Sequence, residues 1–161
     1  AVSLENTPVI QAGYRGTFLC VFLNRSLTTP ADSDIAAVYV ASSQDGVNWD
    51  VPQEVYPPAV GVTSPVVCGR TIPEWIVSFS ARDPQLGASD NDIFVSRSVN
   101  NGPFSSPKII YPNTLLEKGH DHQVNLIFDP NQDQYLAVWS SNETFPGLGS
   151  DFDILLSTSP D

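Results

Sequence analysis

Short apolar runs of six to eight residues recur along the whole chain, separated by polar turns. Three of these runs mix aromatic and aliphatic residues in the partly alternating pattern of a buried strand. They are TFLCVFLN (17–24), EWIVSFSA (74–81) and QYLAVWSS (134–141). Another short strand is expected before each of them, at TPVIQA (7–12), SPVVCG (64–69) and DHQVNLIF (121–128). The pattern predicts an all-β protein made of many short strands.

The apolar pattern belongs to an internal repeat. VYVASSQDGVNWDVPQEVYP (38–57) aligns with IFVSRSVNNGPFSSPKIIYP (93–112) over twenty positions without a gap, and a third copy begins at Ile154. Each unit then holds four strands, which is typical of the blades of a β-propeller. The prediction is one propeller segment over 1–161. Its repeats are 7–57, 64–112 and 121–161, and 1–6 is expected to be an outer strand, the twelfth.

Three blades do not close a ring, because propellers usually have about four to eight blades. Open sheet edges invite pairing with another chain. Two explanations remain open at this point: a homodimer that completes a six-bladed ring, or a segment of a longer propeller.

The aligned segment 38–57 contains a turn with a known sequence motif. Ser43, Asp45, Gly46 and Trp49 match a short form of the Asp-box, or bacterial neuraminidase repeat. The later copies are less complete, with Ser98, Asn100 and Phe104 in the second and Ser159 and Asp161 in the third. In these positions the chain resembles the Asp-box proteins, whose sialidase-like members are six-bladed β-propellers of antiparallel four-stranded blades.

The chemistry of the box favours a structural role. Asp and Gly suit a tight turn, Asp and Ser side chains accept hydrogen bonds from nearby backbone amides, and the aromatic residue covers them. The resemblance implies that the box lies between the third and fourth strands of a blade, on the face opposite the ligand site. We therefore predict a hairpin clasp and not a catalytic site.

Composition limits the partners. Eighteen Asp and Glu against seven Lys and Arg give a net charge of −11, which disfavours nucleic acid and anionic membranes. No apolar run approaches the roughly 20 residues that span a bilayer. Cys20 and Cys68 allow at most one internal disulfide, and two buried thiols are the favoured alternative. Asn24 and Asn142 begin glycosylation sequons that chance also explains.

The acidic residues are concentrated in the loops expected on the ligand face. Ten of the eighteen fall there, including pairs of aspartates at i and i+2 that are possible oxygen ligands for Ca²⁺. The alternative for each pair is an ordinary solvated turn. The candidate residues of this ligand face are Asp83, Asp90, Asp92, Glu117, His120, Asp121, His122, Asp151 and Asp153, with Asp90, Asp92, Asp151 and Asp153 as the calcium candidates.

Both histidines lie at the expected start of a strand, in His120-Asp121-His122. Side chains at i and i+2 of a strand point the same way, so His120 and His122 could share a transition metal, with Glu117 nearby. A polar strand entrance without metal is the alternative.

The resemblance also implies what a sialidase would need: an arginine triad, a Tyr/Glu nucleophile pair and an acid/base Asp. The chain has five arginines and no Arg-Ile-Pro sequence, and no catalytic residue can be assigned by the resemblance. The predicted function is a non-catalytic, secreted or cell-surface module that binds a glycan or a protein through its acidic loops. The alternative is a segment of a sialidase-like glycoside hydrolase whose catalytic residues lie partly outside this chain.

Overall fold

The computed structural model describes residues 3–26, 35–82, 90–110, 119–142 and 151–159 of the 161. These residues form eleven β-strands and one short 3₁₀ turn, Tyr14–Gly16. The strands are β1 (Ser3–Ala12), β2 (Phe18–Ser26), β3 (Ile35–Ser43), β4 (Gln53–Val60), β5 (Thr63–Gly69), β6 (Glu74–Arg82), β7 (Asn91–Val99), β8 (Lys108–Ile109), β9 (Asp121–Asp129), β10 (Gln134–Ser141) and β11 (Asp153–Ser159).

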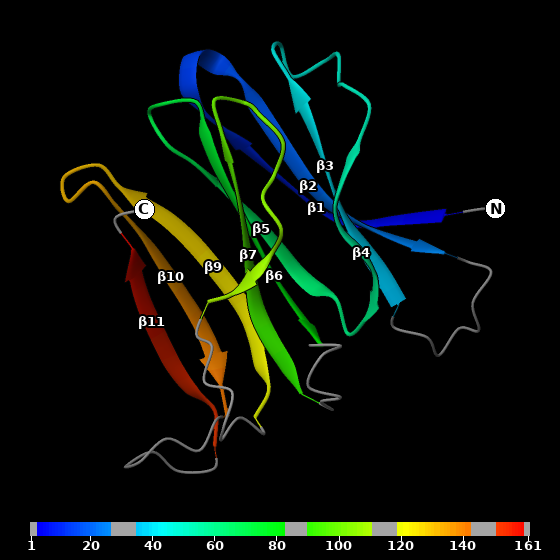
Figure 1. Cartoon of the computed structure of the whole chain (residues 1–161), viewed down its shortest axis with the longest axis vertical. Helices are drawn as coiled ribbons and strands as arrows, with labels where there is room; N and C mark the ends of the chain where they lie inside the picture. Colours follow the sequence, from blue (N-terminus) through cyan, green and yellow to red (C-terminus); the bar gives the residue numbers. More distant parts are fainter. Residues whose placement is uncertain (1–2, 27–34, 83–89, 111–118, 143–150, 160–161) are drawn as a thin grey trace.

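The strands form three antiparallel sheets in chain order, β1-β2-β3-β4, β5-β6-β7-β8 and β9-β10-β11. The first strands of the sheets lie beside one another, because β5 contacts both β1 and β9 (Figure 1). The prediction of an all-β chain with three propeller blades is confirmed. Blade 1 is β1–β4, blade 2 is β5–β8 and blade 3 is β9–β11.

The first residues differ from the prediction. The expected separate outer strand at 1–6 is wrong for residues 3–6, which continue β1 and pair with β2 from Ser3 opposite Ser26 to Asn6 opposite Leu23. The physical reason is continuity: one extended segment keeps its antiparallel ladder with β2 after a single irregularity between Asn6 and Val9. Described strands therefore number eleven and not twelve.

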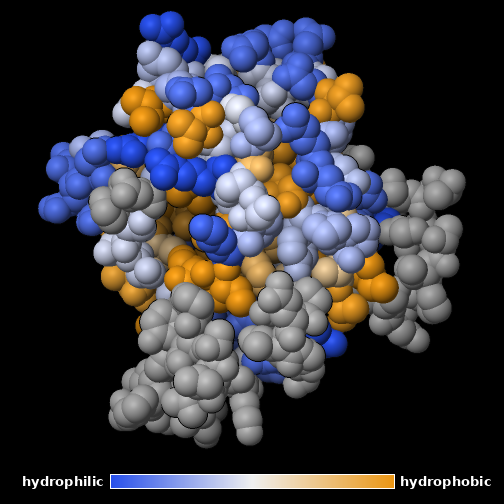
Figure 2. Space-filling view, in the orientation of Figure 1, coloured by the Kyte–Doolittle hydropathy of each residue, from blue (hydrophilic) through white to orange (hydrophobic). Residues whose placement is uncertain are grey.

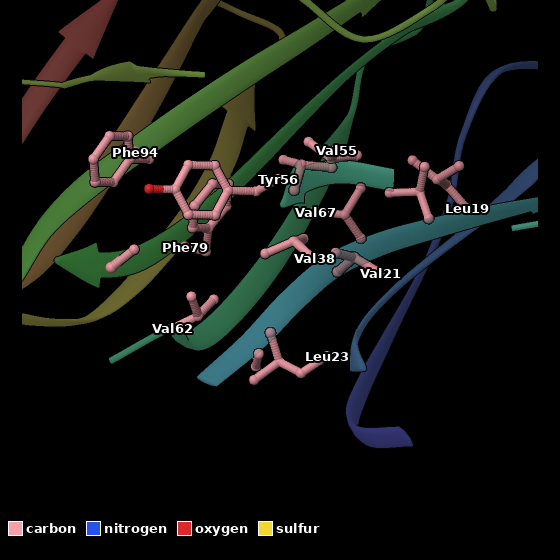
Figure 3. Packing of buried hydrophobic residues seen from close by; sticks show 14 of the residues in the cluster. Leu19, Val21, Leu23, Val38, Val55, Tyr56, Val62, Val67, Phe79 and Phe94 are labelled. Carbon is pink, nitrogen blue, oxygen red and sulfur yellow. The ribbon is translucent and has the colours of Figure 1, made fainter. Parts of the chain in front are cut away.

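Two apolar layers hold the blades together. Between blades 1 and 2, Val21, Val38, Val77 and Phe79 are completely buried in a cluster that Figure 3 shows from close by. Between blades 2 and 3, a second cluster includes the completely buried Ile93 and the buried Trp139. Strands β2 and β6 are buried on both faces, which explains their nearly continuous apolar sequences.

One buried charge also joins blades 2 and 3. Glu74 at the start of β6 is 2% exposed and accepts hydrogen bonds from the Tyr135 hydroxyl at 2.8 Å and from Arg97 at 3.1 Å. Arg70 lies 3.6 Å from the same carboxylate and also pairs with Asp133. Because the buried carboxylate has partners from β7, β10 and the turn before β6, it ties the two blades together.

Among the described residues, no helix is long and apolar enough to cross a membrane.

Candidate functional site at the rim of the inner strands

The Asp-box turn between β3 and β4 is a closed hydrogen-bond network. One carboxylate oxygen of Asp45 accepts bonds from the backbone amides of Val47 at 2.8 Å and Asn48 at 2.7 Å. The hydroxyl oxygen of Ser43 accepts the amide of Gly46 at 2.9 Å, and Gly46 has a φ of +73°. These amide bonds hold the pKa of Asp45 well below its usual range. The carboxylate is fully engaged in shaping the turn.

The second turn has a different construction. Asn100 and Asn101 both have positive φ, and the amide of Gly102 donates to the carbonyl of Val99 at 3.0 Å, as in a tight two-residue hairpin turn. The buried Ser98 hydroxyl donates to the Gly102 carbonyl at 2.6 Å, and Phe104 packs against the core of blades 1 and 2. Asn100 therefore contributes its backbone conformation. In the third copy Ser159 ends β11, and Asp161 lies outside the described residues.

We call the first strands of the three blades, β1, β5 and β9, the inner strands. Away from the box turns, they share an irregularity that the sequence did not predict. The register shifts between Asn6 and Val9 in β1 and between Thr63 and Val66 in β5. In β9 the partner strand shows the same shift, since Val138 lies opposite Asn125 and Ser140 opposite His122. Bulges of this kind re-aim side chains and are frequent near functional sites. Three equivalent bulges thus lie at matching register positions of β1, β5 and β9.

Two of these bulges line an open pocket with a volume of about 540 Å³. Ser64 and Gln123 are the residues inside the shifts, and both have positive φ, 51° and 54°. Their neighbours Thr63 and His122 hold the equivalent positions just before the shift. The lining residues are Thr63, Ser64, His122, Gln123, Ser140 and Phe152.

Aromatic rings form one side of this pocket. His120 and His122 stack with ring centroids 5.6 Å apart, and His122 lies 6.0 Å from the ring of Phe152. The Phe152 side chain is 55% exposed just before β11. Burial, and secondly repulsion from the neighbouring His120, lower the pKa of His122, which favours its neutral form.

The predicted acidic residues gather at the same end of the blades. Asp121 and Asp153 lie on either side of Ser141 in the sheet, and the Ser80 hydroxyl donates to the Asp121 carbonyl at 2.7 Å. Asp90 and Asp92 precede or begin β7 and are 5% and 3% exposed. Asp151 is exposed, whereas Asp83 and Glu117 lie outside the described residues.

The described residues contain no complete ligand set for the predicted metals. No group of three or more His, Cys, Asp or Glu side chains in them is arranged to hold a metal ion. The two histidine rings do lie on one side of β9, as the i, i+2 spacing predicts, but Glu117, the expected third ligand, is not described. Calcium at Asp90, Asp92, Asp151 and Asp153 and a transition metal at His120 and His122 stay predictions.

Three of the five arginines lie toward the end with the box turns. Arg15 and Arg70 are in the turns after β1 and β5, and Arg97 pairs with Glu74. Arg25 and Arg82 end β2 and β6 at the pocket end. The described arginines therefore do not converge on the pocket as a triad.

Two of the three bulges had a weak sequence signal. Thr7-Pro8-Val9 and Ser64-Pro65-Val66 repeat a Ser/Thr-Pro-Val step in the same strand of successive blades, and proline in a strand often marks a bulge. The third bulge, at Gln123, has no proline, so sequence alone gave it no such signal.

No protein-family model and no curated protein sequence matches the chain. Solved structures match its fold. The α-L-arabinanase of Penicillium chrysogenum in complex with arabinobiose has a TM-score of 0.67 and 16% identity, over 96% of this chain and 46% of that one. The α-L-arabinofuranosidase of Fusarium graminearum with an iminosugar inhibitor has a TM-score of 0.64 and 18% identity, over 96% and 46%. The β-1,2-mannobiose phosphorylase of Listeria innocua has a TM-score of 0.52 and 13% identity, over 96% and 55%.

The matches establish a fold shared with propeller glycosidases, and the chain spans about half the length of these structures. They do not support the narrower sialidase assignment that the Asp-box suggested, since the neighbours act on arabinose or mannose-containing saccharides by their names.

Proposed function

We propose that the chain is part of a carbohydrate-binding β-propeller whose ligand lies in the pocket at the rim of the inner strands. The observation that supports this most strongly is the pocket itself, in which two equivalent bulges meet an exposed aromatic ring. Phe152 offers the apolar face of a sugar a flat partner, and Thr63, Gln123 and Ser140 offer hydroxyl and amide groups to its hydroxyls.

The charge of this end favours a neutral saccharide. Asp90, Asp92, Asp121, Asp151 and Asp153 all lie there, and the chain carries a net charge of −11. An anionic sugar such as a sialoside would meet the same sign of charge, whereas a neutral pentose or hexose would not. Three structural neighbours are named as complexes with arabinobiose or mannobiose, which are neutral disaccharides.

A second candidate is a share in the active site of a glycoside hydrolase. It is supported by neighbours named as an arabinanase and arabinofuranosidases, of which this chain spans under half. Such hydrolysis usually needs two carboxyl groups on opposite sides of the glycosidic bond. The acidic residues at the pocket end are candidates for one of them. A sialidase-like activity is the narrower form of this candidate, and secretion or display at the cell surface is the location that suits either function.

Isothermal titration calorimetry of the chain tests binding, with arabinobiose, mannobiose and sialyllactose as ligands, each with added Ca²⁺ and with EDTA. We expect the neutral disaccharides to bind and Phe152→Ala to weaken binding at least about tenfold, or 1.4 kcal/mol. Val51→Ala is the matched control, because Val51 is 86% exposed near the box turn. Equal binding by Phe152→Ala and the wild type would contradict the proposed pocket.

Release of reducing sugar separates the two candidates. We expect the chain alone to bind without turnover. Hydrolysis of an arabino-oligosaccharide or a sialoside is assayed on a longer protein that contains it. Turnover by the chain alone would overturn the non-catalytic assignment, and a Ca²⁺ requirement for binding would support the calcium prediction.

A further inference from the structure

A second pocket lies between blades 1 and 2, at the end of the blades with the box turns. Its volume is about 470 Å³, within the range of small-molecule sites. One wall comes from β2, β3 and the turn that leads to β4, and the other comes from the start of β6 and the turn after β7. We call it the inter-blade pocket, and the pocket between the bulges the rim pocket. The two pockets share no lining residue.

The floor of the inter-blade pocket is apolar and closely packed. Leu19 and Val40 are 4% and 3% exposed and belong to the core between the blades, and Figure 3 shows Leu19 at one end of this cluster. Trp75 adds an indole ring from blade 2. A Cβ built at Gly13 or Gly69 would lie less than 3.0 Å from this ring, so the two glycines leave the indole just enough space. The floor therefore offers a ligand an apolar surface that is already in place.

The rim of the inter-blade pocket is polar. The backbone amide of Asp50 donates to the Ser42 carbonyl at 2.8 Å, and the Ser42 hydroxyl donates to the Asp50 carboxylate at 2.5 Å. These two bonds hold the carboxylate at the pocket edge. Gln44, Gln53 and Asn101 add three exposed carboxamide side chains. Most of the surface at the top of Figure 2, the end with the box turns, is hydrophilic, with small separate hydrophobic patches.

We propose that the inter-blade pocket binds a neutral saccharide, as a site separate from the rim pocket. Carboxamides donate and accept hydrogen bonds, and a carboxylate accepts them, so the rim matches the hydroxyl groups of a sugar. The rings of Trp75 and of the half-buried Phe104 suit the apolar face of the same sugar. None of the described residues that line the pocket is Lys, Arg or His, so an anionic ligand would meet Asp50 without a cationic partner.

A peptide fits this lining less well. An amphipathic helix needs an apolar groove, and a phosphorylated or acidic peptide needs a cluster of arginines. In the inter-blade pocket the apolar residues lie on the floor beneath polar side chains, and its described lining has no arginine.

Isothermal titration calorimetry of Phe152→Ala tests the proposal, because this substitution weakens the rim pocket and leaves the inter-blade pocket intact. We expect arabinobiose or mannobiose to bind Phe152→Ala with one molecule per chain, and the wild type with two. Adding Asp50→Ala and Gln53→Ala to Phe152→Ala should weaken the remaining binding at least about tenfold, since two hydrogen-bonding groups are lost.

The control for this experiment lies away from both pockets. Gln132→Ala removes an exposed glutamine from the turn between β9 and β10 and should leave both sites unchanged. It replaces Val51→Ala, because Val51 lies at the edge of the inter-blade pocket. Circular dichroism verifies that each variant is folded.

The outcomes separate this proposal from that of the rim pocket. If Phe152→Ala binds neither disaccharide, or binds them equally with and without Asp50→Ala and Gln53→Ala, the inter-blade site is wrong. Binding of sialyllactose by Phe152→Ala as tight as that of the neutral disaccharides would overturn the neutral class of ligand. If the wild type and Phe152→Ala bind alike and Asp50→Ala with Gln53→Ala abolishes the binding, the rim pocket is wrong and the inter-blade site stands.

Discussion

Removing the hydroxyl of Tyr135 tests how strongly the buried Glu74 joins blades 2 and 3. The Tyr135 hydroxyl donates to the Glu74 carboxylate at 2.8 Å, the tyrosine is 3% exposed, and the carboxylate is 2% exposed. A hydrogen bond to a charged group contributes about 1.5–3 kcal/mol. We expect Tyr135→Phe to lower the free energy of unfolding by that amount, because water cannot replace the hydroxyl.

Glu74→Ala should cost more, about 3–5 kcal/mol, since it leaves buried donors without their acceptor. The value should fall toward the lower end, because the Arg97 side chain is 37% exposed and can turn to water. Arg70 keeps Asp133 as a partner. The double variant should cost less than the sum of the two single variants, since Tyr135 and Glu74 share one interaction.

The chain offers a matched control on its surface. The Tyr39 hydroxyl donates to Glu54 at 3.0 Å, and that pair is exposed. Tyr39→Phe should cost less than about 1 kcal/mol. Urea unfolding followed by tryptophan fluorescence, at one protein concentration for all variants, measures each value. Equal costs for Tyr135→Phe and Tyr39→Phe would refute the reasoning that burial makes the Glu74 pair strong.

Three further predictions use other features. Asp45→Asn should lower the melting temperature at pH 7. Because the pKa of Asp45 is depressed in the folded state, its stabilisation is present above the unfolded pKa and is lost as pH falls through the folded pKa. The melting temperatures of wild type and variant should therefore converge in acid. The pKa of His122 is also lowered in the folded state, so the unfolded chain takes up a proton there first as pH falls. The free energy of unfolding should therefore decrease below about pH 6.5. His122→Gln should reduce this loss in thermal melts from pH 8 to pH 5. Burial raises the pKa of Cys68 to about 11, so at pH 8 a thiol reagent should label the half-buried Cys20 well before Cys68, and equal labelling would contradict this burial.

Most of the fold could be predicted from the sequence because the chain repeats. Strand β10 was expected at 134–141 and occupies Gln134–Ser141, and β5 begins one residue before the expected 64–69. A repeat fixes the fold class because each unit must bury the same faces against its neighbours. The partner of the first strand could not be predicted in the same way. An alternating segment such as SLEN fits an edge position or an extension of β1 equally well, and only the ladder with β2 decides between them.

The site was predicted only in part, for a reason that lies in the repeat itself. Sequence comparison between blades draws attention to positions that stay alike, such as Ser43 and Ser98, and these positions build turns. The residues just before the three bulges share a backbone position but differ in chemistry, as Asn6, Thr63 and His122. Such positions keep their geometry but differ in chemistry, so they can give a binding site an asymmetric lining. Recognition of one ligand orientation requires such a lining. Equivalent positions that differ between the blades, combined with the strand register, locate the pocket at the bulges. Positions that are similar between the blades locate the box turns at the opposite end.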